Sequence, residues 1–174
     1  MSVDTLKSNI RTIPDFPIKG ILFWDVTTLY KNAACIRELE DILYDLYKDK
    51  GITKVVGIES RGFVMGAALA VKLGAGFVLA RKQGKLPADT LSVTYEKEYG
   101  KDTIEIHTDA IQPDDVVLIH DDLLATGGSA LAASKLVEKF HPAKTYINFI
   151  IEIEDLKGRQ VLPEGVEVTS IIKV

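Results

Sequence analysis

The sequence predicts a single α/β domain in which helices flank a parallel sheet. The chain has 174 residues, which is about the usual size of one domain. It is 47% hydrophobic and 26% charged, an ordinary composition for a globular protein. From residue 54 onward, short β-branched runs alternate with helical patterns, as is typical of parallel strands joined by crossover helices. Because the sequence holds neither an internal repeat nor a linker, we expect one domain over 1–174.

The first thirty residues or so predict a small N-terminal hood, approximately residues 1–30. Apolar residues at helical spacing between residues 3 and 10 predict a short helix that stops before Pro14. Residues 16–23 hold a proline and a glycine, which prevent a long helix, yet their apolar side chains require burial. We therefore interpret this segment as an ordered cover.

The remaining elements are predicted, in chain order, from apolar periodicity and from the capping and turn residues that bound them. Asn32 can cap a helix over about 33–50 that ends at Gly51. Strands are then expected at 54–58, 77–80, 116–120, 145–153 and 166–172, and helices at about 63–73 and 130–140. Residues 82–102 are polar and show no sustained period, so we interpret them as a long mobile loop, and we expect a hairpin arm at 103–107. A loop of this length in a compact domain is usually functional.

Composition excludes several function classes. The formal net charge is -4, and no run of Lys and Arg offers the cationic surface that a nucleic acid requires. Cys35 is the only cysteine, so no intramolecular disulfide can form and a reducing compartment fits best. No stretch approaches the roughly 20 apolar residues that span a bilayer. We expect a soluble cytoplasmic protein without nucleic-acid or membrane partners.

The most informative segment is the apolar strand at 116–120 and the turn that follows it. Ligands of open α/β sheets bind at the carboxyl ends of strands, where Asp121 and Asp122 emerge. The turn Thr126-Gly127-Gly128-Ser129 combines backbone N–H groups, two hydroxyls and a helix N-terminus, which suits a phosphate monoester. It lacks the Gly-Lys-Ser/Thr of a P-loop. The two acids alone could equally form a solvated turn with a helix cap, but the whole pattern indicates a sugar phosphate site.

This segment resembles the binding motif of the phosphoribosyltransferase family, and Asp-Asp-Leu-Leu-Ala-Thr-Gly-Gly resembles its adenine-specific branch. The resemblance implies a parallel phosphoribosyltransferase-type sheet, with Asp121 and Asp122 holding the ribose hydroxyls. It also implies a set of residues that wrap the 5-phosphate: Ala125, Thr126, Gly127, Gly128 and Ser129. His120 stands where an aliphatic residue is usual, and we interpret it as a hydrogen-bonded histidine at a strand end.

Two further segments resemble the family's pyrophosphate-binding elements. Glu59-Ser60-Arg61-Gly62 is similar to its pyrophosphate loop, which implies a non-proline cis peptide before Ser60 and bidentate binding of pyrophosphate by a catalytic Arg61. Residues 81–87 are similar to the start of its mobile loop, and their cations would balance the charge of the leaving group. The implied pyrophosphate-binding residues are Ser60, Arg61, Arg81, Lys82 and Lys85. A solvated cationic surface is the alternative interpretation for the last three.

The same resemblance extends to the base and the lid. Glu98 is implied as the catalytic acid/base that acts on a ring nitrogen of adenine, and Tyr99 as the lid residue over the reacting centre. The hood segment resembles the family's base cover, which implies adenine-binding residues at Leu22, Phe23, Trp24 and Leu123. Trp24 stands where most relatives have Arg.

Together these matches imply that the chain transfers the 5-phosphoribosyl group from phosphoribosyl pyrophosphate to adenine, giving AMP and pyrophosphate. They also imply Mg²⁺ held mainly by the substrate, with no metal ligated by the protein alone, and a homodimer. Two alternatives stay open. The substrate could be another purine base, or the chain could be a non-catalytic regulator that binds phosphoribosyl pyrophosphate. A regulator of that kind would need a DNA-binding module, for which the acidic chain offers little room.

Overall fold

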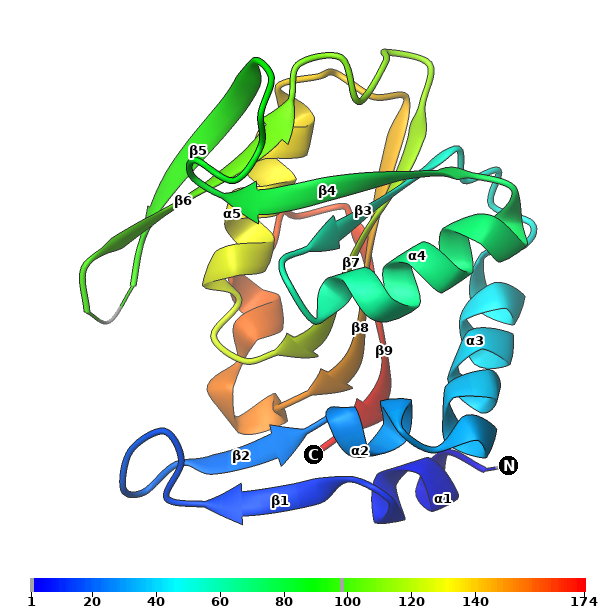
Figure 1. The fold of residues 1–174 in the computed structure, drawn as a ribbon, viewed down its shortest axis with the longest axis vertical. Helices are drawn as coiled ribbons and strands as arrows, with labels where there is room; N and C mark the ends of the chain where they lie inside the picture. The colour runs from blue at the N-terminus through cyan, green and yellow to red at the C-terminus, as the bar shows by residue number, and fades with distance from the viewer. Residues whose placement is uncertain (1, 98) are drawn as a thin grey trace.

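A computed structural model of the chain describes residues 2–97 and 99–174. Its main sheet has seven strands in the order β5-β6-β4-β3-β7-β8-β9 (Figure 1). In chain order the strands are β3 (Lys54–Ile58), β4 (Gly76–Lys82), β5 (Thr90–Glu96), β6 (Lys101–His107), β7 (Val116–Leu124), β8 (Lys144–Glu152) and β9 (Glu167–Lys173). The pairs β4-β3, β3-β7, β7-β8 and β8-β9 are parallel, and β5 and β6 are an antiparallel arm at one edge. The predicted α/β fold class is confirmed.

Helices cover both faces of this sheet, as Figure 1 shows. They are α3 (Ala33–Tyr47) and α4 (Gly62–Leu73) on one face and α5 (Gly128–Glu138) on the other. Successive strand residues point to opposite faces, so Val56 and Ile119 are buried with the residues of α5, whereas Val55 and Leu118 are buried with those of α3 and α4. The strands are apolar on both sides for this reason, which is the pattern expected of a buried parallel sheet.

The predicted N-cap of α3 and the predicted C-cap of α4 are present, whereas α3 ends at Tyr47 instead of continuing to residue 50. The Asn32 side chain accepts hydrogen bonds from the amides of Ala34 and Cys35 at 3.0 and 3.3 Å. Gly74 ends α4 in the left-handed conformation with a φ of 68°, which glycine adopts without steric cost. These local signals fix where the two helices begin or end relative to the sheet.

The N-terminal hood is more regular than the cover that the sequence predicts. It contains α1 (Val3–Ser8), β1 (Arg11–Pro14), β2 (Leu22–Asp25) and α2 (Thr27–Tyr30). β1 and β2 pair antiparallel as a separate two-stranded sheet, in which Ile13 lies opposite Phe23. Figure 1 shows this hairpin at the same end of the molecule as the carboxyl ends of β7 and β8.

The prediction of a continuous loop over 82–102 is wrong, because residues 90–96 form β5. Leu91, Val93 and Tyr95 pack against the core, whereas the residues between them are exposed. This is a two-residue period that the polar composition of the segment concealed. β5 pairs with β6 along its whole length, and this pairing forms an antiparallel arm from a segment that buries few of its side chains.

Two 3-10 helices that the sequence did not predict connect β8 to β9. They are η1 (Glu154–Leu156) and η2 (Gly158–Val161). Among the residues that the structure describes, no helix combines the length and the apolar character needed to cross a membrane.

Candidate functional site

A pocket of about 230 Å³ lies where the carboxyl ends of β3, β4 and β7 meet. Its lining combines cationic side chains, a pair of carboxylates and the first turn of α5. Eight of the predicted site residues line it: Ser60, Arg61, Arg81, Lys82, Asp121, Asp122, Leu123 and Ser129. The structure thus gathers segments that are more than sixty residues apart in the sequence into one site.

The acid pair lies within β7, which is four residues longer than the predicted strand. Asp121 pairs with Phe149 of β8, and the Asp122 amide donates a 2.8 Å hydrogen bond to the Asp121 carboxylate. Asp122 itself is buried. Burial, together with the adjacent Asp122 carboxylate, raises the pKa of Asp121 well above its ordinary value. A ribose hydroxyl or a cation would therefore find a carboxyl group that is poorly solvated and open to a new partner.

Arg61 connects the loop after β3 to the acid pair and to the hood. Its Nε donates to the Asp122 carboxylate at 2.5 Å, and its guanidinium carbon lies 5.8 Å from the centre of the Phe23 ring. The Tyr30 hydroxyl donates to the Arg61 carbonyl at 3.4 Å. Burial and the nearby Asp122 carboxylate raise the pKa of Tyr30 above its ordinary value, so this hydroxyl keeps its proton. Nearly half of the Arg61 side chain is still exposed, which leaves donors for a ligand.

Gly62 allows α4 to begin directly against β7. A Cβ atom at this position would lie 2.8 Å from the His120 carbonyl oxygen and 3.1 Å from the Asp121 carboxylate. A side chain would therefore separate Arg61 from the acids. The peptide between Glu59 and Ser60 is cis, as the resemblance implies.

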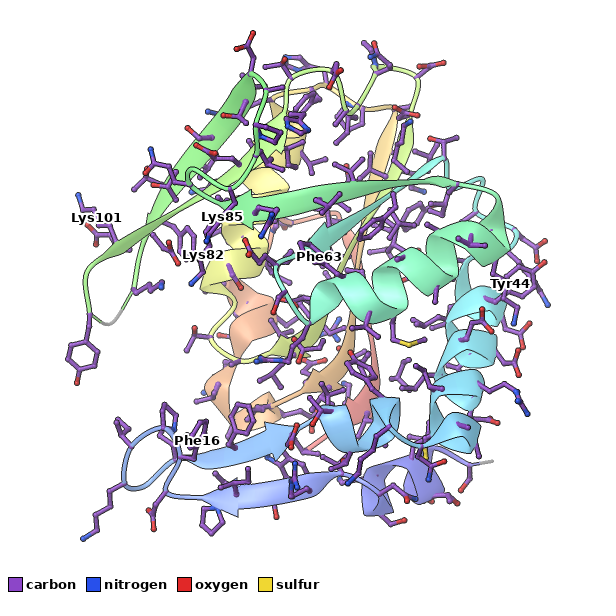
Figure 2. All side chains as sticks on the ribbon, in the orientation of Figure 1. Phe16, Tyr44, Phe63, Lys82, Lys85 and Lys101 are labelled. Carbon is purple, nitrogen blue, oxygen red and sulfur yellow. The ribbon has the colours of Figure 1, made fainter. Side chains whose placement is uncertain are left out.

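Arg81 and Lys82, which the resemblance assigns to pyrophosphate, already have carboxylate partners. Arg81 donates to Glu59 at 3.0 Å, and the Lys82 amide donates to the other Glu59 oxygen at 2.8 Å. The Lys82 Nζ lies 3.7 Å from the Asp102 carboxylate. Figure 2 shows Lys82 and Lys85 at the carboxyl end of β4. Nothing in the sequence pattern indicated these pairings, because both partners are distant along the chain.

The Glu59 ion pair makes the protein's stability depend on pH. The hydrogen bond from Arg81 lowers the pKa of Glu59 below its ordinary value of 4.5. A depressed pKa contributes stability above pH 4.5, and this contribution is lost as the pH falls through the folded-state pKa. Urea unfolding of wild type and Glu59→Gln should therefore differ most near neutral pH and converge in acid. A difference that is constant with pH would contradict this assignment.

The phosphate loop, residues 125–129, joins β7 to α5. Gly127 has a φ of 88°, and α5 begins at Gly128. The amide groups of the first helical turn lack acceptors within the helix and point toward an incoming anion. Thr126 is exposed and Ser129 lines the pocket. The arrangement can bind a phosphate group beside the two carboxylates.

His120 lies just before the acid pair and is fully buried. Its Nδ1 is 2.9 Å from the Asn148 side-chain oxygen, as expected for a hydrogen-bonded histidine. Among the described residues its Nε2 has no hydrogen-bond partner. Burial lowers the pKa of His120 to about 4, so the ring is neutral at physiological pH.

The predicted base-binding residues lie on β2 and at the end of β7. Leu123 lines the pocket, whereas Leu22, Phe23 and Trp24 lie on β2 outside the lining. Phe23 packs edge-on against Phe16 at 5.1 Å, and Leu22 is 47% exposed. This part of the hood therefore presents apolar surface close to Arg61.

Tyr99, the predicted lid residue, lies in the turn between β5 and β6. Tyr99 is 82% exposed. Glu98, the predicted acid/base, lies outside the described residues. Within the described ranges, no group of three or more His, Cys, Asp or Glu side chains is arranged to hold a metal ion.

Comparison with known proteins identifies the family. The model of the phosphoribosyl transferase domain matches residues 25–163. An adenine phosphoribosyltransferase of Phocaeicola vulgatus is 63% identical over 172 residues, which is 99% of each chain. The crystal structure of the Giardia lamblia enzyme complexed with 9-deazaadenine is 46% identical, with a TM-score of 0.94 over 100% of this chain and 98% of that one.

A more distant structure extends the likeness. The Trypanosoma brucei adenine phosphoribosyl transferase, in complex with AMP, pyrophosphate and ribose-5-phosphate, is 25% identical, with a TM-score of 0.90 over 98% of this chain and 78% of that one. The matches cover the hood, the acid pair and the phosphate loop. The chain belongs to the phosphoribosyltransferase family, in its adenine phosphoribosyltransferase branch.

Proposed function

We propose that the chain transfers the 5-phosphoribosyl group from phosphoribosyl pyrophosphate to adenine, giving AMP and releasing pyrophosphate. One observation carries the proposal: a single pocket holds the acid pair, the Arg61 guanidinium and the first turn of α5. This combination suits a ribose with a phosphate at one end and a pyrophosphate at the other. The similar Giardia lamblia and Trypanosoma brucei enzymes, in complexes with an adenine analogue or with AMP and pyrophosphate, support it.

In this proposal the phosphate loop binds the 5-phosphate and the acid pair holds the ribose hydroxyls. The hydroxyls of Thr126 and Ser129 and the amides at the start of α5 donate to phosphate oxygens. Asp121 and Asp122 accept from the sugar, which fixes the anomeric carbon for attack. Because the pKa of Asp121 is raised, its charged form is disfavoured in the free site. A ligand that donates a hydrogen bond or brings positive charge would stabilise that form.

Arg61 is proposed to stabilise the departing pyrophosphate. Cleavage at the anomeric carbon builds positive charge on the ribose and negative charge on the leaving group. Arg61 already lies beside the acid pair, and its exposed donors, with the Ser60 hydroxyl, can bind pyrophosphate oxygens. Lys82 and Lys85 add positive charge at the same end of β4, while Arg81 is held by Glu59.

Adenine is proposed to enter between the hood and the end of β7. Backbone groups at Leu22 and Trp24 form hydrogen bonds with the edge of the base, and the side chains of Phe23 and Leu123 contact its faces. Glu98 then exchanges a proton with a ring nitrogen, and Tyr99 helps to exclude water from the reacting centre. Tyr95, which lies on β5 just before these residues in the sequence, lines the pocket.

Mg²⁺ is proposed as the cofactor, bound mainly through substrate oxygens. The donor set fits: Asp121 and Asp122 line the pocket, and magnesium is commonly held by one or two carboxylates plus phosphates and water. When bound, the ion would neutralise charge on the pyrophosphate. We further propose a homodimer in the cytoplasm, with small-molecule substrates and without nucleic-acid or membrane partners. These proposals rest on the family resemblance.

The activity is tested by supplying adenine, hypoxanthine or guanine with phosphoribosyl pyrophosphate and Mg²⁺ and measuring nucleotide and pyrophosphate. We expect AMP and pyrophosphate in equal amounts from adenine and no product from the other bases. Turnover of another purine alone would assign a different base specificity. Tight binding of phosphoribosyl pyrophosphate with no product from any base would make the chain a regulator instead.

A further inference from the structure

The phosphate loop rests on the turn formed by η2. A Cβ atom on Gly158 would collide with the carbonyl oxygen of Ala125 and would lie 2.9 Å from a Leu124 methyl group. In the other direction, a Cβ atom on Gly127 would lie 2.6 Å from the Gly158 carbonyl oxygen and from a Val161 methyl group. Two glycines therefore bring the backbones of the loop and of η2 into direct contact.

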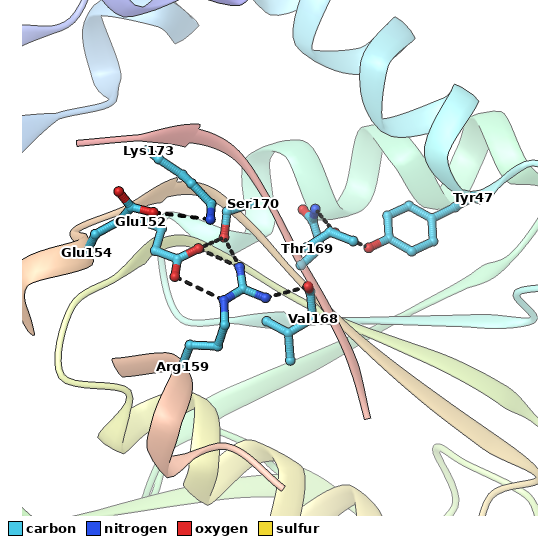
Figure 3. Close-up of polar contacts among 9 residues, drawn as sticks. Tyr47, Glu152, Glu154, Arg159, Val168, Thr169, Ser170 and Lys173 are labelled. Carbon is cyan, nitrogen blue, oxygen red and sulfur yellow. Dashed lines mark hydrogen bonds and ion pairs between the residues drawn. The ribbon is translucent and has the colours of Figure 1, made fainter. Parts of the chain in front are cut away.

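Arg159, the residue next to Gly158, ties η2 to the sheet (Figure 3). Its Nε and one terminal nitrogen donate to the two oxygens of Glu152 at 3.0 and 2.5 Å. The other terminal nitrogen donates to the Val168 carbonyl at 2.6 Å. The Ser170 hydroxyl donates to Glu152 at 2.6 Å and accepts from Arg159 at 3.2 Å. One guanidinium thus holds η2 against both β8 and β9.

We propose that Arg159 is a positioning residue for the phosphate loop: by fixing Gly158 beneath Ala125 and Gly127, it sets the loop geometry that binds the 5-phosphate. The Glu152 side chain is only 7% exposed, so the carboxylate that accepts both bonds is shielded from solvent, and the bidentate pairing fixes the orientation of the partly exposed guanidinium. The effect passes mainly through backbone contact, because the nearest neighbours of Gly158 and Gly127 include each other's segments through the carbonyl groups of Ala125 and Gly158. The inference rests on the proposed function of the loop.

Lysine at position 159 separates positioning from charge. Arg159→Lys keeps the positive charge but cannot span both Glu152 oxygens and the Val168 carbonyl at once. Arg159→Gln removes the charge as well. We expect both variants to bind ribose 5-phosphate and AMP roughly 10- to 100-fold more weakly, as expected when a binding group is displaced by a fraction of an ångström to an ångström. The KM for phosphoribosyl pyrophosphate should rise similarly while the KM for adenine changes little.

Tyr47→Phe is a matched control, because Tyr47 of α3 contacts Thr169, the residue of β9 that neighbours Ser170. The Tyr47 hydroxyl is 2.6 Å from the Thr169 hydroxyl, and Thr169 directly precedes Ser170 but faces the opposite side of the sheet (Figure 3). This variant loses a partly buried contact to the same strand without touching η2. It should lower the free energy of unfolding but leave the affinity for ribose 5-phosphate unchanged.

Gly158→Ala tests the contact itself. Its methyl group would push the loop away from η2, so phosphate affinity should fall at least as far as in Arg159→Lys. Binding is measured by calorimetry, and the ³¹P shift of bound AMP reports the phosphate environment directly. We expect that shift to move in both the Arg159 and the Gly158 variants and not in Tyr47→Phe. Thermal melting establishes that each variant is folded under the assay conditions.

Three outcomes bear on the proposal. Weak phosphate binding with a moved ³¹P shift in folded Arg159→Lys supports it. Wild-type affinity in Arg159→Lys, with a loss only in Arg159→Gln, would assign the effect to charge and overturn positioning. Equal losses in Tyr47→Phe would make Arg159 merely structural. If wild type itself does not bind ribose 5-phosphate, the proposed function fails before this inference is reached.

Discussion

Arg61→Ala is expected to lower kcat/KM for phosphoribosyl pyrophosphate by about 100- to 1000-fold, which is the typical loss when one preorganised donor to developing negative charge is removed. Arg61 donates to Asp122 at 2.5 Å and lines the pocket with about half of its side chain exposed. The variant would lose a donor to pyrophosphate and leave the buried Asp122 without its cation. Steady-state kinetics with both substrates varied measures the effect.

Lys72→Met is a suitable control for this substitution. Lys72 lies in the last turn of α4, the helix that Arg61 precedes, and its Nζ is 2.6 Å from Asp41. The control therefore removes an ion pair at the far end of the same helix. It should retain wild-type kinetics. Wild-type kcat/KM in a folded Arg61→Ala protein would remove Arg61 from the mechanism.

Glu98→Gln is expected to lower kcat by about 100- to 10 000-fold, the usual contribution of a positioned general acid or base. Glutamine keeps the size of the side chain but cannot exchange the proton. Binding of phosphoribosyl pyrophosphate should change little, because in our proposal Glu98 contacts only the base. Single-turnover rates together with equilibrium binding of this substrate separate the two effects.

Glu96→Gln provides the comparison two residues away on the same arm. The Glu96 side chain is 83% exposed and lies 4.0 Å from Lys101, and exposed pairs of this kind contribute little to stability. We expect this variant to keep wild-type turnover. Unchanged turnover in Glu98→Gln would mean that another group, or no protein group, handles the proton on adenine.

Much of the fold was predictable because local signals and burial agreed. Asn32 and Gly74 carry their own capping chemistry, and the strands at 54–58 and 145–153 are apolar on both faces. The strand at 90–96 was missed because only alternate residues pack, and partial burial of Leu91 and Val93 is a weak signal in a polar segment. The backbone hydrogen-bond partners of this strand are on β6, and local sequence does not show that pairing.

The candidate site also divides into residues that local sequence indicates and contacts that only the fold creates. Asp121, Asp122 and the turn after them could be predicted because they are contiguous and follow the apolar first half of a buried strand. The pairing of Arg61 with Asp122, and of Arg81 with Glu59, joins residues brought together only by parallel strand order. Arg159 carried no signal at all, since a lone arginine in a polar segment is ordinarily solvated. Its partners Glu152 and Ser170 are placed by β8 and β9.

A crystal structure with AMP bound is the most direct test of this account. We predict the 5-phosphate on residues 126–129 at the start of α5, the ribose hydroxyls on Asp121 and Asp122, and the base beneath β2. A nucleotide bound elsewhere, with the pocket that Arg61 and the acid pair line left vacant, would contradict both the residue roles and the reaction that they are proposed to perform.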